Sequence, residues 1–262
     1  MPYAVVLELV GEKPPPYLGK HAHGLFFALL SQMDSELATR LHVAPRKPFT
    51  ITPLGEGQGT LLLRLTMLDD ELLSPFLHTL LQIAPKGLPL GDTSYRLVRV
   101  LSTPEGHPLA GRVSWEALRD APSVTEVALA FRTPTVFTTS KPGGRTRYTP
   151  LPEPRLIFRS LLEKWQAHSP YPYAPEEAAA LLEVLELELE LSSFRRLRFF
   201  RVQVARGFFP GFTGEVQVKL HGDCTEAQRT LGILQTYAFY AGVGAKTTYG
   251  LGLTVPLSTK SS

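Results

Sequence analysis

Three residues near position 42 have the types and the spacing that phosphodiester chemistry uses. His42 stands at the expected end of a helical region, and Arg46 and Lys47 follow it across a proline-containing turn. An imidazole can move a proton near neutral pH, while a nearby cation neutralises negative charge that develops on a phosphate. These residues are therefore candidate catalytic groups. The competing interpretation is a structural histidine at a helix end.

Two more histidines, His21 and His23, stand near the expected start of the first helix. Their protonated forms would oppose the helix dipole at that end, but a helix start also binds phosphate groups. We keep both as candidate helpers in catalysis. The alternative is that they are solvated residues at the start of the helix.

A loop with four glycines and one lysine lies at residues 242–252, between a predicted helix and the predicted last strand. Glycine tolerates positive φ and lets a backbone approach a ligand closely, and exposed backbone N–H groups suit phosphate oxygens. The candidates for RNA contact in this loop are Gly242, Gly244, Lys246, Thr247, Gly250 and Gly252.

Two common nucleotide motifs do not fit this loop. A Walker A loop needs a glycine directly before its lysine and leads from a strand into a helix, whereas Ala245 precedes Lys246 here and the order is helix to strand. The dinucleotide fingerprint fails because Thr247 stands where its third glycine belongs. Two interpretations remain: a clamp on a nucleic-acid backbone, or a glycine-rich connection that turns the chain.

Basic residues gather in the second half of the chain, where aromatic residues interleave with them between positions 194 and 212. This combination suits contact with a nucleic-acid backbone together with base stacking. The alternative is that the arginines are solvated or pair with the acidic run at 183–190. The candidates for RNA contact are Arg145, Arg147, Arg195, Arg196 and Arg198.

Composition narrows the class of protein. The chain has 262 residues, 44% of them hydrophobic and 19% charged, which predicts compact globular domains, and its net charge of +3 permits a polyanionic partner. Cys224 is the only cysteine, so an internal disulfide and a cysteine-built zinc site are excluded. We find no metal or cofactor motif, signal peptide or membrane span. We therefore expect a cytoplasmic protein without a cofactor, bound metal or membrane partner.

The predicted elements repeat one pattern. In the first half we expect a strand at 3–10, a helix from 19, a short second helix capped by Asp34 or Ser35, a hairpin at 47–54 and 60–68, a helix from 69 to 81, and a strand at 95–102. This is the β-α-β-β-α-β order of ferredoxin-like folds.

The second half repeats this order. We expect a strand at 124–131, a helix from 156 to 165, a strand at the end of the Leu/Glu alternation 181–191, a hairpin turning at Pro210 and Gly211, a helix at 225–240 and a strand at 249–255. The predicted class is α+β. Residues 1–110 form one ferredoxin-like domain that carries His42, residues 124–262 form a second that carries the glycine-rich loop, and residues 111–123 join them.

Several segments together resemble one family, the CRISPR repeat-processing endoribonucleases of the repeat-associated mysterious protein superfamily. The resemblance covers nearly the whole chain, and the glycine-rich loop marks the superfamily. The other segments that carry it are Leu37–His42, Lys47–Thr50, Phe131–Phe137 and Pro152–Leu156.

This resemblance implies two tandem ferredoxin-like domains and metal-independent cleavage of precursor CRISPR RNA within its repeats, so the expected partner is CRISPR repeat RNA as precursor and product. A ribose 2′-OH would attack the adjacent phosphate and leave a 2′,3′-cyclic phosphate and a 5′-OH. His42 falls on the general acid/base position, and Lys47, or Arg46 in its place, falls near the stabilising cation. Phe27 stands where some members carry a tyrosine, which leaves His21 or His23 as helpers.

Two alternatives to this nuclease remain open. A non-catalytic RNA-binding subunit of a CRISPR effector complex would share the fold and the loop, and a nucleotide-binding protein would use the loop through Lys246. The sequence also leaves open whether the chain joins an effector complex or forms a homodimer.

Overall fold

The computed structural model describes residues 1–12, 18–55, 59–140, 146–204 and 207–258. The chain divides into two compact units. The first contains residues 1–113 together with Val204 and the segment Thr248–Gly250, and the second contains the remaining described residues. Three residues of the C-terminal loop are therefore part of the N-terminal unit.

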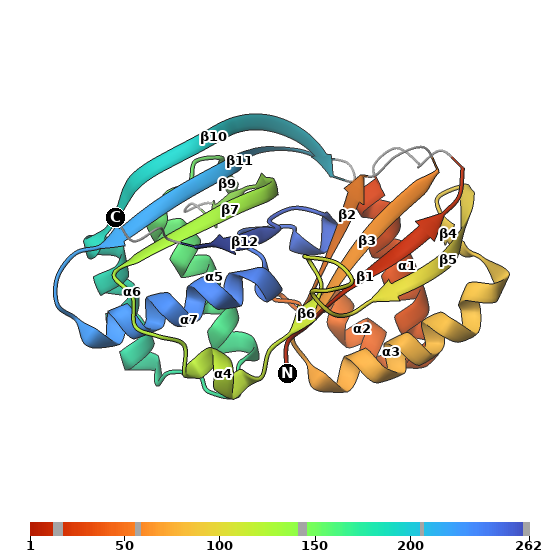
Figure 1. The fold of residues 1–262 in the computed structure, drawn as a ribbon, viewed down its shortest axis with the longest axis horizontal. Helices are drawn as coiled ribbons and strands as arrows, with labels where there is room; N and C mark the ends of the chain where they lie inside the picture. Colours follow the sequence, from red (N-terminus) through yellow and green to blue (C-terminus); the bar gives the residue numbers. More distant parts are fainter. Residues whose placement is uncertain (13–17, 56–58, 141–145, 205–206, 259–262) are drawn as a thin grey trace. The chain divides into compact units, whose positions relative to one another are not determined.

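The first unit is a ferredoxin-like fold. Its sheet has the strand order β2-β3-β1-β5-β4, with β6 paired to β1, and its helices lie on one face (Figure 1). The elements are β1 (Tyr3–Val10), α1 (Leu18–Met33), α2 (Ser35–Val43), β2 (Phe49–Gly55), β3 (Thr60–Met67), α3 (Asp70–Ile83), the 3-10 turn η1 (Ala84–Lys86), β4 (Leu88–Leu90), β5 (Thr93–Leu101) and β6 (Gly111–Arg112).

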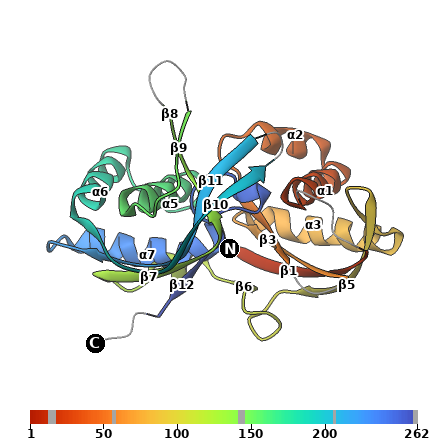
Figure 2. The same ribbon diagram turned by 90° about the horizontal axis from the view of Figure 1, so that it is seen from above.

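The second unit repeats this topology. Its main sheet has the order β10-β11-β7-β12, and β8 with β9 forms a separate hairpin that projects from the unit (Figure 2). The elements are α4 (Trp115–Arg119), β7 (Glu126–Thr135), β8 (Phe137–Ser140), β9 (Thr146–Thr149), α5 (Pro154–His168), α6 (Pro175–Glu188), β10 (Leu189–Val204), β11 (Gly207–Leu220), α7 (Thr225–Ala241), the 3-10 turn η2 (Thr247–Tyr249) and β12 (Thr254–Leu257).

Alternation and capping explain these elements. In β1 the side chains of Val5, Leu7 and Leu9 join the core beneath α1 and α3, because successive residues of a strand face opposite sides. The carboxylate of Asp34 accepts the Leu37 N–H at 2.9 Å and caps α2, which confirms one of the two expected caps. The two predicted ferredoxin-like folds are therefore present.

The segment after β5 covers part of the other face of the first sheet. Val6 and Leu62 on that face pack with Ala110, which comes from the segment after β5. The guanidinium of Arg64 is buried, and its Nε donates to the Leu109 carbonyl at 2.8 Å. A buried charge requires such a partner, so this contact fastens the covering segment to the sheet.

One expected feature of the second unit is confirmed and one is wrong. The Leu/Glu alternation ends as a strand, as expected, because β10 begins at Leu189, while the earlier part of the run belongs to α6. Leu181 and Leu185 are buried four residues apart on one side of that helix, while Leu187 is 75% exposed. The expected turn at Pro210 and Gly211 lies inside β11 instead.

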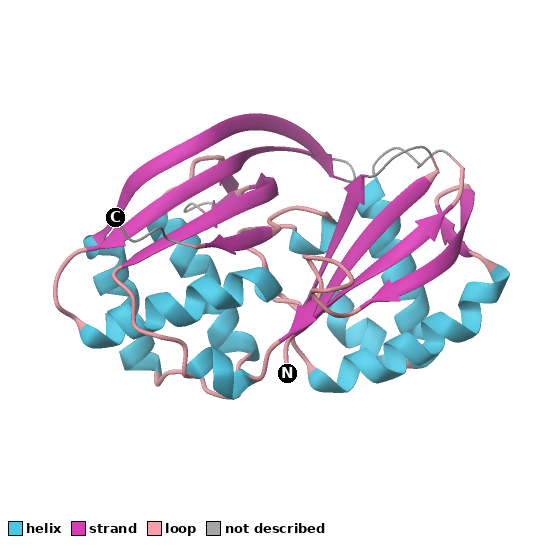
Figure 3. Cartoon of the chain, in the orientation of Figure 1, coloured by secondary structure: helices cyan, strands magenta, loops and turns pink. Residues whose placement is uncertain are grey.

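In each unit the helices lie along one face of the sheet (Figure 3), and one helical glycine allows close packing against a loop. Gly232 in α7 is buried, and a Cβ there would lie 2.0 Å from the Pro122 carbonyl oxygen. Gly232→Ala should therefore lower the free energy of unfolding by roughly 1–3 kcal/mol, although alanine favours a helix. Chemical denaturation measures the change.

The matched control is Gly24→Ala in α1, where an added Cβ meets nothing within 4 Å. This change should raise the free energy of unfolding by about 0.5–1 kcal/mol through helix propensity alone. Equal effects of the two substitutions would contradict the close approach of α7 to Pro122.

Candidate active site

The first unit gathers four rings into one cluster. α1 supplies His23 and Phe27, one helical turn apart, and the last turn of α2 supplies His42. The ring centroids of His23 and His42 lie 6.4 Å apart, and the ring of Phe27 meets His42 edge-on at 5.1 Å. Tyr249 adds the fourth ring, so two imidazoles and one phenol lie together on this unit.

His23 is held by the C-terminal segment. The imidazole is only 7% exposed, and its Nδ1 lies 3.1 Å from the Thr248 carbonyl oxygen. A carbonyl oxygen can only accept, so Nδ1 carries the proton and Nε2 of the neutral ring carries a lone pair. The Tyr249 ring stacks on the imidazole at 4.0 Å with an angle of 17°. One short segment thus fixes both the tautomer and the orientation of His23.

Two glycines let this segment approach α1. A Cβ on Gly19 would lie 2.1 Å from the Tyr249 carbonyl oxygen, so any other residue would push the segment away from the helix. Gly250 has a φ of +95°, a backbone conformation that residues with a side chain rarely adopt. Burial raises the pKa of the Tyr249 phenol above its usual value, so the phenol is neutral at physiological pH and can donate a proton in a hydrogen bond.

Lys47 is placed to organise His42. Its Nζ donates to the carbonyl oxygens of His42 at 3.1 Å and Ala44 at 3.0 Å, which are terminal acceptors of α2. A cation at this end also favours the helix dipole. His42 itself is exposed, as is Arg46 in the turn that follows.

The structure separates the two histidines of α1. His21 precedes His23 by two residues and therefore points to a different side of the helix. Among the described residues, the ring cluster includes His23 and not His21. The buried position of His23 also excludes the interpretation of a solvated residue at a helix start.

Several backbone N–H groups of the glycine-rich loop form hydrogen bonds within the protein. The Gly242 N–H donates to Ala238, the Gly244 N–H to the Ser160 hydroxyl, and the Gly252 N–H to Pro134. A Cβ on Gly244 would lie 2.5 Å from the Val136 carbonyl oxygen. Close packing therefore explains these glycines, and RNA contact by them stays a prediction.

Lys246 and Thr247 are the polar side chains of this loop that reach the surface. Lys246 is exposed, and its φ of 60° is in the left-handed region that non-glycine residues seldom adopt. Its Nζ lies 5.8 Å from the centroid of the Phe209 ring, so the ammonium group stands over an aromatic face.

The predicted basic residues lie on two hairpins of the second unit. Arg147 is exposed on β9, and Arg195, Arg196 and Arg198 are exposed on β10. Arg196 approaches Glu215 at 3.9 Å, a distance at which an exposed pair contributes little to stability. Arg145 lies outside the described residues.

Sequence reasoning missed Thr248 and Tyr249 as members of the site. Their partner His23 is 225 positions away in the chain, so no local spacing connects them. The available signal was an aromatic residue inside the glycine-rich loop, which a plain turn does not need.

The fold and this cluster define a class: a protein of two tandem ferredoxin-like units with a histidine pair on the first unit and a glycine-rich loop near the C-terminus. A model of the Cas6 N-terminal domain matches residues 1–61, and a model of the CRISPR-associated endoribonuclease Cas6 matches residues 129–254. The chain belongs to the Cas6 family of CRISPR-associated endoribonucleases.

Solved and curated relatives agree with this family. A Cas6 product complex of the Thermus thermophilus protein is 64% identical, covers 98% of this chain and 100% of that one, and superposes with a TM-score of 0.96. A second Cas6 product complex is 32% identical over 98% of this chain and 99% of that one, with a TM-score of 0.82. The Cas6 endoribonuclease of Streptococcus thermophilus is 27% identical over 92% of each chain.

In the part of the chain that the structure describes, no helix is both long and apolar enough to cross a bilayer.

The hydrogen bond to Thr248 predicts the tautomer of His23. Long-range ¹⁵N–¹H correlation spectra of histidine-labelled protein should show the Nδ1–H form for neutral His23, because the Thr248 carbonyl accepts from Nδ1. Gly19→Ala should reduce the population of this form by displacing the neighbouring Tyr249 carbonyl. Gly24→Ala on the same helix is the control and should leave it unchanged. A dominant Nε2–H form in the unaltered protein would contradict the contact.

Proposed function

We propose that this protein is a metal-independent endoribonuclease that cleaves precursor CRISPR RNA within its repeats. The ribose 2′-OH attacks the adjacent phosphorus while the bond from phosphorus to the 5′-oxygen breaks, which yields a 2′,3′-cyclic phosphate and a 5′-OH. The observation that carries this proposal is the pair of imidazoles, His23 and His42, with ring centroids 6.4 Å apart on one unit.

The reaction needs one proton acceptor and one proton donor. The 2′-OH loses its proton as it attacks, and the departing 5′-oxygen gains one. His42 is exposed at the end of α2 and is the group that we assign to proton transfer with the RNA. His23, with its tautomer set by Thr248, supplies the second imidazole, and the neutral Tyr249 phenol stands beside it as a further donor.

The cations divide into two roles. Lys47 donates to the carbonyl groups at the end of α2, so we assign it to positioning His42. Arg46 is exposed in the adjoining turn, and its permanently charged guanidinium suits the phosphate oxygens, whose negative charge increases in the transition state. His21 lies outside the ring cluster, and we give it no role in proton transfer.

RNA binding is assigned to the second unit. The exposed Lys246 and the arginines of β9 and β10 supply positive charge, and exposed Phe194, Phe199 and Phe200 on β10 supply faces for stacking. The relatives support the kind of ligand, since two solved Cas6 structures are product complexes and a third is a substrate mimic complex. We propose that the ligand of this chain is repeat RNA, both as precursor and as cleaved product.

The central test is His42→Ala. RNA carrying the repeat of the neighbouring CRISPR array should be cut once in EDTA by the unaltered protein, and the substitution should slow single-turnover cleavage by roughly 10²–10⁴-fold while RNA binding persists. His78→Ala is the control, because His78 lies on α3 and bonds to Gln82 outside the cluster. Full activity of His42→Ala would remove this residue from the mechanism.

The same assay distinguishes the nuclease from a second candidate function. The fold and loop are also compatible with a non-catalytic RNA-binding subunit of a CRISPR effector complex. Tight binding of repeat RNA without cleavage, in EDTA and with divalent metal ions present, would favour that function over the nuclease. Cleavage that EDTA abolishes would contradict metal independence.

Lys246 provides a test of the loop. If its ammonium group neutralises one phosphate, Lys246→Ala should weaken RNA binding and lower the slope of log K against log salt by about one unit. Binding titrations at several salt concentrations measure this slope. Lys86→Ala, at an exposed position after α3, is the control and should leave the slope unchanged. An unchanged slope in Lys246→Ala would indicate a purely structural loop.

A further inference from the structure

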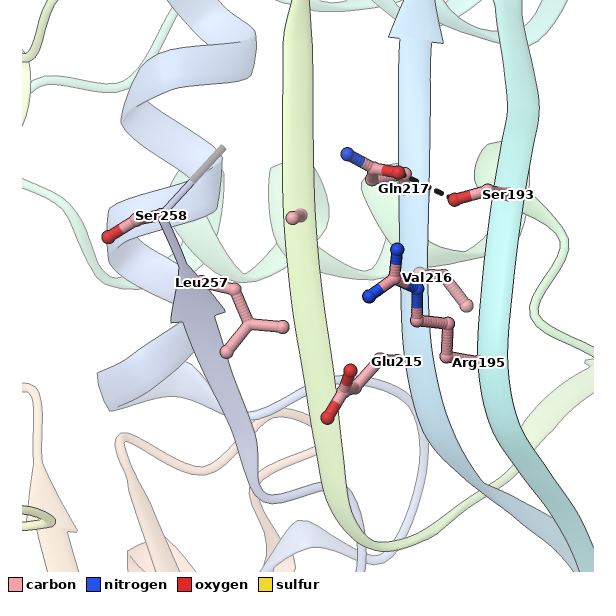
Figure 4. A pocket seen from close by; sticks show the side chains of 8 residues that line it. Ser193, Arg195, Glu215, Val216, Gln217, Leu257 and Ser258 are labelled. Atoms are coloured by element: carbon pink, nitrogen blue, oxygen red, sulfur yellow. Dashed lines mark hydrogen bonds between the residues drawn. The ribbon is translucent and has the colours of Figure 1, made fainter. Parts of the chain in front are cut away.

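A small hollow lies on the sheet of the second unit, on the face away from α5 and α7 (Figure 4). Its volume is about 180 Å³, and it spans the strands β10, β11, β7 and β12. The side chains that matter to its chemistry come from Ala128, Ser193, Arg195, Glu215, Gln217 and Leu257.

A small residue at the centre of the sheet creates this hollow. Ala128 on β7 is paired with Gln217 on one side and with Leu257 on the other. Side chains of residues paired across strands stand on the same face, so a methyl group lies between two longer side chains. The result is an apolar floor with a polar wall along β10 and β11, which suits the face of a flat ligand.

The polar wall presents defined donors and acceptors. The Ser193 hydroxyl donates to Oε1 of Gln217 at 2.6 Å, which orients the amide so that its nitrogen is turned toward β7 (Figure 4). Glu215 offers carboxylate oxygens, and the Arg195 guanidinium lies across β11 between Glu215 and Gln217 (Figure 4). The wall therefore contains donors and acceptors side by side.

The backbone departs from regular strand geometry beside the hollow. Arg196 has a φ of 53° and Gly214 a φ of 141°, and a Cβ on Gly214 would lie 2.9 Å from the Leu197 Cα. The register of β11 against β7 also shifts between Phe212 and Gly214, and such a bulge re-aims side chains. Arg195 lines the hollow, while Arg196 approaches Glu215 at 3.9 Å from the adjacent position.

The charges within the hollow favour an uncharged ligand. Arg195 and Glu215 offset each other there, so a phosphate group would meet a carboxylate as well as a guanidinium. A planar heterocycle has the complementary properties: a face for the apolar floor, and edges that both donate and accept. The exposed arginines that continue along β10 can hold the phosphates on either side of it.

We propose that this hollow binds one unpaired guanine base of an RNA strand. Guanine accepts at O6 and N7, which match the paired donors of Arg195, and it donates from N1–H and the N2 amino group, which match the carboxylate of Glu215. Adenine binds less well because its N1 is an acceptor and cannot donate to that carboxylate. Pyrimidines bind less well because they lack N7 as an acceptor for Arg195. The inference depends on the proposed function only in taking RNA as the ligand.

The test uses four RNA 11-mers, in which five uridines flank a central G, A, C or U on each side. Fluorescence anisotropy with the unaltered protein should show about tenfold tighter binding of the guanine 11-mer. Arg195→Ala and Glu215→Gln should each reduce this preference to less than about twofold, since each removes one of the two matched edges. Thermal melting checks that both variants are folded.

Lys219→Ala is the matched control. Lys219 is exposed on β11, four residues after Glu215 and outside the hollow. Its loss removes one positive charge, as Arg195→Ala does, and should weaken all four RNAs equally while the guanine preference persists. Equal affinity of the unaltered protein for the four RNAs would overturn the proposal, as would a preference retained in both hollow variants.

The binding assay tests the guanine site and the cleavage assay tests the proposed nuclease, so one proposal can be contradicted while the other is supported. Guanine preference without cleavage of repeat RNA would contradict the proposed nuclease and support this inference. Cleavage of repeat RNA without guanine preference in the 11-mers would do the reverse.

Discussion

The hydrogen bond between His23 and the Thr248 carbonyl is the contact on which the candidate site depends. A buried imidazole must satisfy its N–H, and this one does so with a backbone group that comes from the far end of the chain. The stacking of Tyr249 on the same ring needs the close approach that Gly19 permits. His42 then lies beside a ring whose tautomer and orientation are already set. A catalytic histidine in solution would have neither constraint.

Local patterns predicted much of the fold and one half of the site. Apolar periodicity located most of the helices and strands, and the position of His42 before a turn with two cations was visible in the sequence. The role of His23 was undetermined because its partner is remote. The strand at the end of the 181–191 run was predicted, but the alternation of Leu and Glu could not show where α6 ends. That helix buries Leu181 and Leu185 and tolerates an exposed Leu187. Pro210 and Gly211 read as a turn, yet β11 continues through them.

The glycine-rich loop illustrates why glycine spacing alone is ambiguous. Phosphate binding and close backbone packing both require a missing Cβ, and the sequence cannot distinguish them. In this protein Gly244 and Gly252 sit against the carbonyl oxygens of Val136 and Val243, where a Cβ would lie 2.5 Å and 2.1 Å away. Between these two glycines, Lys246 adopts a left-handed conformation, and the Thr248 carbonyl contacts His23. The loop thus combines a structural role with one exposed cation.

The two ferredoxin-like units share a topology, but they differ at the face of the sheet that lies away from the helices. In the first, Ala110 and the Arg64–Leu109 contact cover part of the sheet face, and the candidate catalytic residues lie on α1 and α2. In the second, the sheet face carries a hollow with Arg195 and Glu215 at its edge. The candidate catalytic residues and the residues of the hollow belong to different units, so substitutions can occur in one set without altering the other. If the two proposals hold, a duplicated fold can keep the proposed proton-transfer groups constant while the proposed base-selecting groups vary.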